Sequence, residues 1–270
     1  SVHRNGERIL RPMSERIVFV GAGNVAWHLA PALEQAGHEI VSVYSQSLEN
    51  AKRLTERLTK ATPTNTLDFQ DTRATLLIFA LSDAVYGEVV RQTQAPQNAL
   101  WVHTSGSQPM EVLRKDANRI GVFYPLQTFS KTKTVKVEEV LFCLESDHTE
   151  DYPRLEALVE TLGAPQRPMS SSQRTQVHLA AVFGCNFANL VWQVTEKLLK
   201  EQNLEFQILE PLFRETLEKA ILLNPTNAQT GPAIRGDQNI LNKHQQMLKD
   251  HSEFSELYIL ASRMIEKFGD

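Results

Sequence analysis

The chain has 270 residues, enough for one large domain or two smaller ones with a sizeable core. Its composition, 41% hydrophobic and 22% charged, is typical of a soluble globular protein, and a net charge of −4 argues against nucleic acid or an anionic membrane as a partner. Cys143 and Cys185 lack metal-ligand spacing, and no apolar stretch approaches the roughly 20 residues of a membrane span. We therefore expect a cytoplasmic protein that binds a small molecule and no metal.

The first residues carry charge but no hydrophobic run after it, so they do not form a secretory signal. Met13 directly precedes the first expected strand. We expect the folded part to begin at Met13, with residues 1–12 as a tag remnant or a loose extension.

A short β-branched and aromatic run at residues 16–20 enters a Gly-x-Gly turn, and helical periodicity begins at once. Such a strand, turn and helix open a dinucleotide-binding unit. Gly21 permits the tight turn, Gly23 leaves room for a pyrophosphate, and Ala26 lets the helix approach the strand. The N–H groups at the start of the helix then face the phosphates, although glycines also mark ordinary strand–helix turns. The expected cofactor contacts in this motif are Gly21, Gly23, Asn24 and Val25.

Strands and helices alternate through the first half of the chain. We expect strands at residues 16–20, 40–44, 76–81, 100–103, 121–124 and 140–144. A first helix starts at Val25 and is closed by Gly37, and further helices are expected at residues 49–58, 86–91 and 151–162. This alternation predicts an α/β fold with a doubly wound, mainly parallel sheet.

Past Pro168 the pattern becomes helical. Ser170 and Gln173 fit a capping box, and helices are expected at residues 171–200, 206–223, 238–249 and 253–268. We therefore predict an NAD(P)-binding Rossmann domain at residues 13–168 and an all-helical domain at residues 169–270. In such pairs the active site usually lies between the domains, at the carboxyl ends of the strands.

The second strand ends in Ser45 and Gln46, and no carboxylate follows before Glu49. An NAD enzyme usually places Asp or Glu here to hold the ribose hydroxyls. Hydroxyl groups with Lys52 and Arg53 nearby accept a 2′-phosphate instead, which favours NADP. The alternative is that both cations are solvated charges on a helix.

Polar residues also follow the next two strands. We expect Ser82 to contact the nicotinamide ribose or a phosphate, and Asp83 either to join it or only to cap the following helix. His103 is a candidate acid or base, and Ser105 a candidate substrate contact; a turn with a hydrogen-bonded histidine is the alternative. Gln127, after the fifth strand, lies in a proline-directed loop or in a cleft wall.

The helix expected at residues 171–200 carries four polar residues on one side. With a rotation of about 100° per residue, their side chains fall within a stripe about 80° wide around the helix axis. A solvated helix face more often carries Lys and Glu. We interpret His178 and Asn186 as lining the interdomain cleft, with satisfied core polar groups as the alternative. The stripe consists of His178, Asn186, Asn189 and Gln193.

Arg235 lies in the turn Thr-Gly-Pro-Ala-Ile-Arg-Gly-Asp that joins two helices. Its guanidinium either binds an anion or a substrate carboxylate, or pairs with Asp237 to hold the turn.

Five motifs together resemble one family. They are Gly-Ala-Gly-Asn-Val from Gly21, His-Thr-Ser-Gly from His103, Tyr-Pro-Leu-Gln-Thr-Phe from Tyr124, His-Leu-Ala-Ala-Val-Phe from His178 with Asn186-Phe, and the turn from residue 230. The family is that of Rossmann-like proteins with a DUF2520 domain, labelled NADP oxidoreductases of the F420-dependent type. The resemblance implies a helical domain related to that of 6-phosphogluconate and β-hydroxyacid dehydrogenases, and a homodimer formed through it. It assigns no substrate.

One residue departs from those dehydrogenases, which place a catalytic lysine four residues before an asparagine on the long helix. If Asn186 is that asparagine, the lysine position holds Val182. Either His178 or His103 then replaces the lysine, or the substrate is an already protonated imine that needs no protein acid, or no redox chemistry occurs. The leading hypothesis is an NADP-dependent oxidoreductase that acts on a small carbonyl, hydroxy or imine compound. The rival is a non-catalytic NADP-binding sensor or interaction protein.

Overall fold

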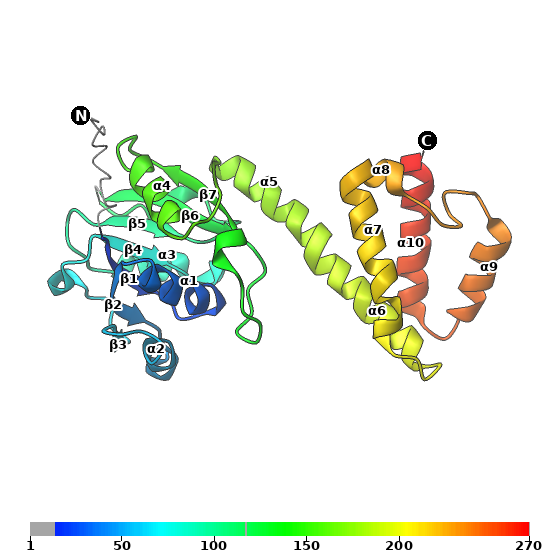
Figure 1. The fold of residues 1–270 in the computed structure, drawn as a ribbon, viewed down its shortest axis with the longest axis horizontal. Helices are drawn as coiled ribbons and strands as arrows, with labels where there is room; N and C mark the ends of the chain where they lie inside the picture. Colours follow the sequence, from blue (N-terminus) through cyan, green and yellow to red (C-terminus); the bar gives the residue numbers. More distant parts are fainter. Residues whose placement is uncertain (1–13, 117, 270) are drawn as a thin grey trace, which may run out of the picture. The chain divides into compact units, whose positions relative to one another are not determined.

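The computed structural model describes residues 14–116 and 118–269 (Figure 1). Met13 and the expected extension at residues 1–12 lie outside the described residues. The chain divides into two compact units, one ending at residue 183 and one beginning at residue 184. Each unit is described by itself.

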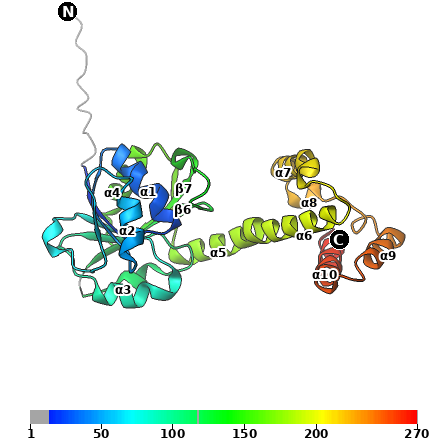
Figure 2. The same ribbon diagram turned by 90° about the horizontal axis from the view of Figure 1, so that it is seen from below.

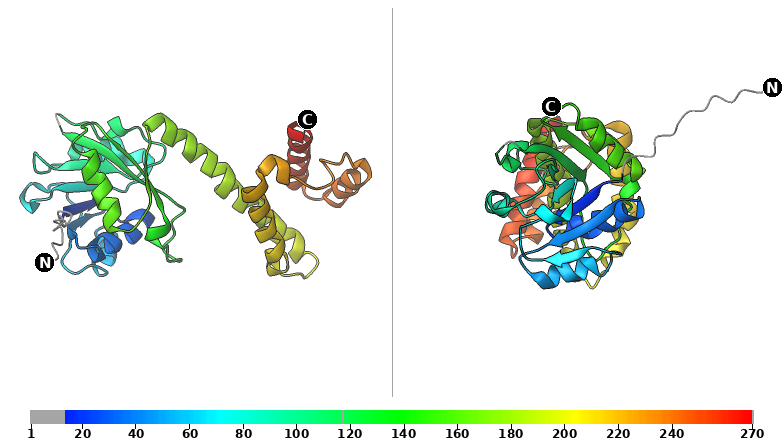
Figure 3. Two further views of the ribbon diagram at one scale, coloured as in Figure 1. Left: turned by 45° about the horizontal axis from the view of Figure 1, so that its top comes forward. Right: turned by 90° about the vertical axis from the view of Figure 1, so that its left-hand side faces the viewer.

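The first unit is built on one eight-stranded sheet in the order β3-β2-β1-β4-β5-β6-β7-β8. All neighbouring strands are parallel except β6 and β7, which form an antiparallel pair. Figure 3 shows this sheet from two further directions. The strands are β1 (Arg16–Val20), β2 (Glu39–Tyr44), β3 (Thr62–Thr64), β4 (Leu76–Phe79), β5 (Leu100–His103), β6 (Arg119–Leu126), β7 (Leu141–Ser146) and β8 (Gln166–Pro168).

Helices cover both faces of this sheet (Figure 2). The apolar sides of α1 (Asn24–Gln35), α2 (Leu48–Thr55) and α4 (Tyr152–Thr161) pack into one buried cluster, and that of α3 (Tyr86–Gln92) packs into another. The central strands β1, β4 and β5 are buried along most of their length, as expected for parallel strands with helices on both sides. The predicted doubly wound α/β architecture is confirmed.

Two edge strands, β3 and β8, were not expected from the sequence. They contain only three residues each, Thr-Pro-Thr and Gln-Arg-Pro, and neither has an apolar alternation. Proline is tolerated here because an edge strand leaves part of its backbone unpaired.

The second half of the chain is helical, also as predicted. The capping box is present: Ser170 Oγ accepts from the Gln173 amide at 3.3 Å, and the Ser170 amide donates to Gln173 Oε1 at 3.0 Å. The expected helix at residues 171–200 contains an unexpected π-helical turn at Val182–Phe187. The helices are α5 (Ser171–Ala181), α6 (Ala188–Lys200), α7 (Glu210–Leu223), α8 (Pro225–Ala228), α9 (Gln238–Met247) and α10 (Ser252–Gly269).

The second unit exposes an unusual amount of apolar surface. Among its described residues, the buried hydrophobic side chains are Ala233, Leu241 and Leu248, whereas Ile221 and Leu222 are 75% and 81% exposed. Amphipathic helices normally bury such residues, and large exposed apolar patches mark interaction surfaces.

The Ser171–Lys200 segment is also long and apolar enough to cross a membrane, by length and composition alone. This corrects the expectation that no stretch of the chain reaches that length. The expectation considered uninterrupted apolar runs, whereas the hydropathy of this segment is an average that includes polar residues such as Asn186. A helix that packs against other helices has the same composition, so the property by itself is weak support for a membrane span.

Candidate functional site

The turn after β1 requires glycine. Gly21 has φ +122°, and a Cβ atom there would lie 2.1 Å from the carbonyl oxygen of Ala80. Its amide donates to the Tyr44 carbonyl at 2.9 Å, so the turn is held between the ends of β2 and β4. A side chain would therefore separate the strands at the place where they meet.

Helix α1 begins at the surface without a side-chain cap. Gly23 is its N-cap residue, and no atom lies within 4 Å of a Cβ placed there. Gly23 and Asn24 are exposed, Val25 is half-buried, and Ala26 packs fully into the core. The first amides of a helix have no intrahelical partner. Open space in front of them fits the pyrophosphate of a dinucleotide.

The end of β2 presents no carboxylate, as the sequence predicted. Ser45 is half-buried, Gln46 is exposed, and Ser47 accepts from the Asn50 amide to cap α2. Arg53 is exposed and lies 3.5 Å from Glu49, an i,i+4 pair whose net attraction is small in water. Among the described residues, this end of β2 thus presents hydroxyl groups, and Glu49 is paired with Arg53.

Asp83 and the loop after β5 form a hydrogen-bonded network. The Asp83 carboxylate accepts from Ser105 Oγ at 2.8 Å and also from Ser107 Oγ. Ser105 Oγ in turn accepts from the amides of Ser107 and Gln108. Asp83 therefore fixes this loop, while Ser82 stays exposed beside it.

His103 supports the same loop from inside. It is fully buried, and its Nδ1 accepts from the Ser105 amide at 3.1 Å. Burial, together with the Arg174 guanidinium, lowers the pKa of His103 to about 3. Its Nε2 has no hydrogen-bond partner among the described residues. The imidazole is therefore neutral near pH 7.

Arg174 anchors α5 to this loop. It is fully buried, and its Nη1 donates to Glu145 Oε2 at 2.7 Å. Nε donates to the Ser105 carbonyl at 3.2 Å, and Nη2 donates to the Gln108 carbonyl at 2.6 Å and to Ser171 Oγ at 3.2 Å. The sequence analysis did not identify Arg174 as a site residue. Its position one helical turn after the Ser170 cap is the feature of the sequence that could have indicated its role.

His178 lies one turn further along α5 and meets Tyr124. Its Nδ1 is 3.4 Å from the Tyr124 hydroxyl, and the two rings meet edge to face. A Cβ atom on Gly106 would lie 2.5 Å from that Nδ1. The structure thus brings His178 to the loop after β5, which contains Ser105 and Gly106.

Gln127 is not part of this network. Gln127 is exposed, and its Oε1 accepts from the Thr128 amide. Asn186 lies in the π-helical turn and Arg235 in the turn before α9, both exposed and both in the second unit. Asp237 caps α9 by accepting from the Ile240 amide, as expected. The π-helical turn changes the angle per residue from which the polar stripe was calculated, and the common face of His178 and Asn186 stays a prediction.

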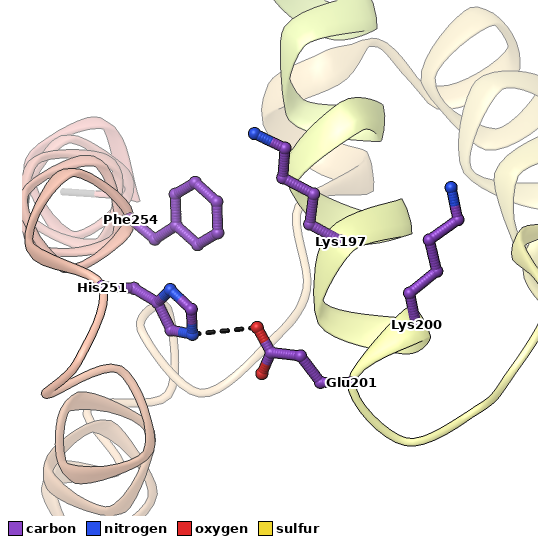
Figure 4. Close-up of a pocket in the computed structure, with 5 residues that line it drawn as sticks. All are labelled: Lys197, Lys200, Glu201, His251 and Phe254. Atoms are coloured by element: carbon purple, nitrogen blue, oxygen red, sulfur yellow. Dashed lines mark ion pairs between the residues drawn. The ribbon is translucent and has the colours of Figure 1, made fainter.

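Two pockets are lined by residues that do not belong to the network around Asp83 and Arg174. One of about 460 Å³ belongs to the second unit, where His251 Nε2 is 2.9 Å from Glu201 Oε1 and Lys197 Nζ lies 5.7 Å from the centre of the Phe254 ring (Figure 4). Its lining residues are Lys197, Lys200, Glu201, His251 and Phe254. The other, of about 420 Å³, lies along β2 and β3 and includes Ser42 and Thr62. Neither contains a predicted site residue.

Two family profiles match the sequence. One is described as a Rossmann-like domain and covers residues 3–126, and the other is described as a domain of unknown function, DUF2520, and covers residues 140–265. A comparison with curated proteins finds no match.

Solved structures match over nearly the whole chain. The "putative NADP oxidoreductase BF3122" from Bacteroides fragilis is 41% identical, with a TM-score of 0.86 over 94% of this chain and 98% of that chain. An imine reductase from Pseudomonas sp. is 16% identical, with a TM-score of 0.68 over 95% of each chain. A reductive aminase from Aspergillus terreus, in complex with NADPH and ethyl-5-oxohexanoate, is 13% identical, with a TM-score of 0.71 over 94% and 93%. The last two matches indicate a common fold.

Proposed function

The chain belongs to the family of proteins in which a Rossmann-like domain is followed by a DUF2520 domain, and we propose that it transfers hydride between NADP(H) and a small carbonyl, hydroxy or imine substrate. The general role is that of an NADP-dependent oxidoreductase. The main support for this role is the start of α1 after Gly21 and Gly23, where no side chain caps the helix. The chain is also 41% identical to a protein described as an NADP oxidoreductase.

NADP(H) is the cofactor, and the relative in complex with NADPH has the same fold. Gly21, Gly23, Asn24 and Val25 hold the pyrophosphate, because the amides of the first helical turn are open there. The 2′-phosphate lies at the end of β2, beside Ser45 and Gln46. Ser82 and Asp83, after β4, contact the nicotinamide half.

The substrate is a small carbonyl, hydroxy or imine compound. Solved structures with this fold include an imine reductase and a reductive aminase in complex with NADPH and ethyl-5-oxohexanoate. Ser105, Gln127 and Arg235 are the proposed substrate contacts, with Arg235 as an anchor for a carboxylate. Asn186 orients the reacting group as a hydrogen-bond donor.

His178 is better suited than His103 to proton transfer. His103 is fully buried and neutral, and its Nδ1 already accepts from the Ser105 amide. His178 is half-buried and meets Tyr124 at the carboxyl edge of the sheet. We therefore assign proton transfer to His178 and the positioning of the Ser105 loop to His103.

The active protein is a homodimer joined through the helical unit. Among the described residues of that unit, large apolar side chains on α6, α7 and α10 are exposed, including Trp192, Leu222 and Met264. A second copy is the partner that buries them, because interfaces of stable homodimers are the most apolar. We expect a dimer in size-exclusion chromatography with light scattering, and monomers or aggregates for Leu222→Asp. A monomeric wild-type protein would contradict the assignment.

The cofactor assignment is tested by thermal unfolding. A ligand at about 100 times its Kd adds about 2.7 kcal/mol to the free energy of unfolding, so NADPH raises the Tm by roughly 5–10 °C. NADH raises it less, because it lacks the 2′-phosphate. No shift with either nucleotide would refute the cofactor and the function together.

The alternative function is a sensor that binds NADP without redox chemistry. Val182 favours it, because valine stands where related dehydrogenases are expected to hold a catalytic lysine, and it cannot transfer a proton. A sensor binds NADPH but oxidises none of it in the presence of a panel of carbonyl compounds and imines. His178→Gln lowers turnover in the enzyme and leaves NADPH binding intact in both cases.

A further inference from the structure

Three segments of the first unit meet at one point: Tyr124 from β6, Gly106 from the loop after β5, and His178 from α5. The Tyr124 hydroxyl lies 3.4 Å from His178 Nδ1, and the ring centroids are 6.5 Å apart at an interplanar angle of 68°. Both side chains are at least partly shielded from water, and Tyr124 is only 8% exposed.

Gly106 makes room for this contact. A Cβ atom at that position would lie 2.5 Å from His178 Nδ1 and 2.8 Å from the Tyr124 hydroxyl. Gly106 is not among the glycines with positive φ, so the position requires glycine for space and not for a turn. Any side chain there would occupy the place where the two polar groups meet.

The pair lies at the edge of the sheet where the cofactor is expected. Strand β5 pairs with β6 up to His103 and Val122, and Tyr124 lies two residues beyond. This is the carboxyl end of the parallel strands, the same edge at which β1 enters the Gly21 turn. Ligands of open α/β sheets bind along that edge.

Arg174 holds the pair in place. It precedes His178 by four residues on α5, so the two side chains lie on the same side of the helix. Its bonds to Glu145 and to the carbonyls of Ser105 and Gln108 fix α5 against the loop that contains Gly106. A group positioned in this way loses little entropy when it reacts.

Tyr124 carries a proton under ordinary conditions. Burial raises the pKa of its hydroxyl above the usual value, and the nearby Cys143 thiol acts in the same direction. The phenol is therefore protonated at neutral pH and able to donate.

We propose that Tyr124 is the proton donor of the reduction and that His178 is its proton relay, an inference that rests on the oxidoreductase function proposed above. NADPH, when bound, supplies the hydride to the substrate carbon. The π electrons of the C=O or C=N bond move to the oxygen or nitrogen, which takes the phenolic proton of Tyr124. His178 takes one proton from solvent and returns it through Nδ1 to the phenolate. The sum is one hydride and one proton added to the substrate, and one NADP⁺ formed.

The contact is tested first without turnover. Nitrogen-15 NMR of the imidazoles, with NADP⁺ bound, reports which nitrogen of His178 carries the proton and whether the other accepts a hydrogen bond. Tyr124→Phe removes the hydroxyl, and Gly106→Ala pushes His178 away from it, so both shift the Nδ1 signal. Tyr152→Phe is the matched control, because the Tyr152 hydroxyl donates to Gln166 and its ring packs against a different buried cluster from that of Tyr124. An Nδ1 signal unchanged by Tyr124→Phe overturns the proposal.

Turnover supplies the second test, with cyclohexanone as the carbonyl probe and 1-pyrroline as the imine probe. We expect Tyr124→Phe to lower kcat by about 10²–10⁴-fold, the usual contribution of a positioned acid, and His178→Gln to lower it less. The thermal shift with NADPH stays at the wild-type value in both, and the exposed His148→Gln serves as the histidine control. An unchanged kcat in Tyr124→Phe refutes the proton donor. Absence of turnover with both probes in the wild-type protein contradicts the proposed oxidoreductase function. The NMR result then decides separately whether Tyr124 and His178 are hydrogen-bonded.

Discussion

Arg174 is the residue whose replacement gives the sharpest test of the structure. We expect Arg174→Met to lower the free energy of unfolding of the first unit by about 3–5 kcal/mol. Removing one member of a buried ion pair costs this much because the other is left without its partner. Here the remaining group is the Glu145 carboxylate, which is 20% exposed and, among the described residues, keeps the bond from Ser171 Oγ. The carbonyls of Ser105 and Gln108 lose a donor as well, at about 1–3 kcal/mol for each one left unsatisfied, although water offsets part of this.

Urea unfolding at one protein concentration, followed by circular dichroism, measures the loss. The matched control is Arg214→Met, because Arg214 is 72% exposed and pairs with Glu210 one helical turn away. We expect that variant to lose less than about 0.5 kcal/mol. Adding Glu145→Leu to Arg174→Met removes the unpaired carboxylate and restores part of the stability. A loss below about 1 kcal/mol for Arg174→Met, or one equal to that of the control, would refute Arg174 as the anchor between α5 and the sheet.

Two further predictions concern the proposed 2′-phosphate site at the end of β2 and the buried side chain of His103. Ser45→Glu places a carboxylate at the end of β2, so NADPH affinity falls by roughly tenfold or more while NADH affinity is kept or improved; equal losses for both nucleotides in fluorescence titrations would mean that the 2′-phosphate lies elsewhere. His103 binds its proton at pH 6.5 in the unfolded chain and only near pH 3 in the folded one. The contribution of neutral His103 to the free energy of unfolding is therefore complete above pH 6.5. It is lost as the pH falls from 6.5 toward 3, and the loss reaches up to about 5 kcal/mol. His103→Gln should flatten this part of the stability curve, and parallel curves for the variant and the wild type would contradict the burial of a neutral imidazole.

The Rossmann architecture was predictable because its signals are local. The Gly21 turn, the amphipathic helix after it and the buried runs at residues 76–79 and 100–103 each show their structure in a few neighbouring residues. The capping box at Ser170 belongs to the same class, and both of its hydrogen bonds are present. The edge strands β3 and β8 were not predicted, because each has three residues that pair through backbone atoms alone, which leaves no pattern in the side chains.

The candidate site was only partly predictable. Spacing along an ideal helix grouped His178 with Asn186; the π-helical turn between them changes the angle per residue, so this grouping stays a prediction. His103 had the right residue type at the right strand end, yet its ring points into the core and supports Ser105 from behind. Which side of a strand end faces water depends on what packs over it, and residues near in sequence do not show this.

The sequence by itself determined the fold class, the phosphate-binding turn and the absence of a carboxylate after β2, because each depends on residues within about a dozen positions of one another. The tertiary structure decided which polar groups act together. Arg174, Glu145 and Ser105 come from α5, β7 and the loop after β5, and Tyr124, Gly106 and His178 from three separate segments. Their contacts arise because parallel strands bring distant loops to one edge of the sheet and α5 then packs against that edge.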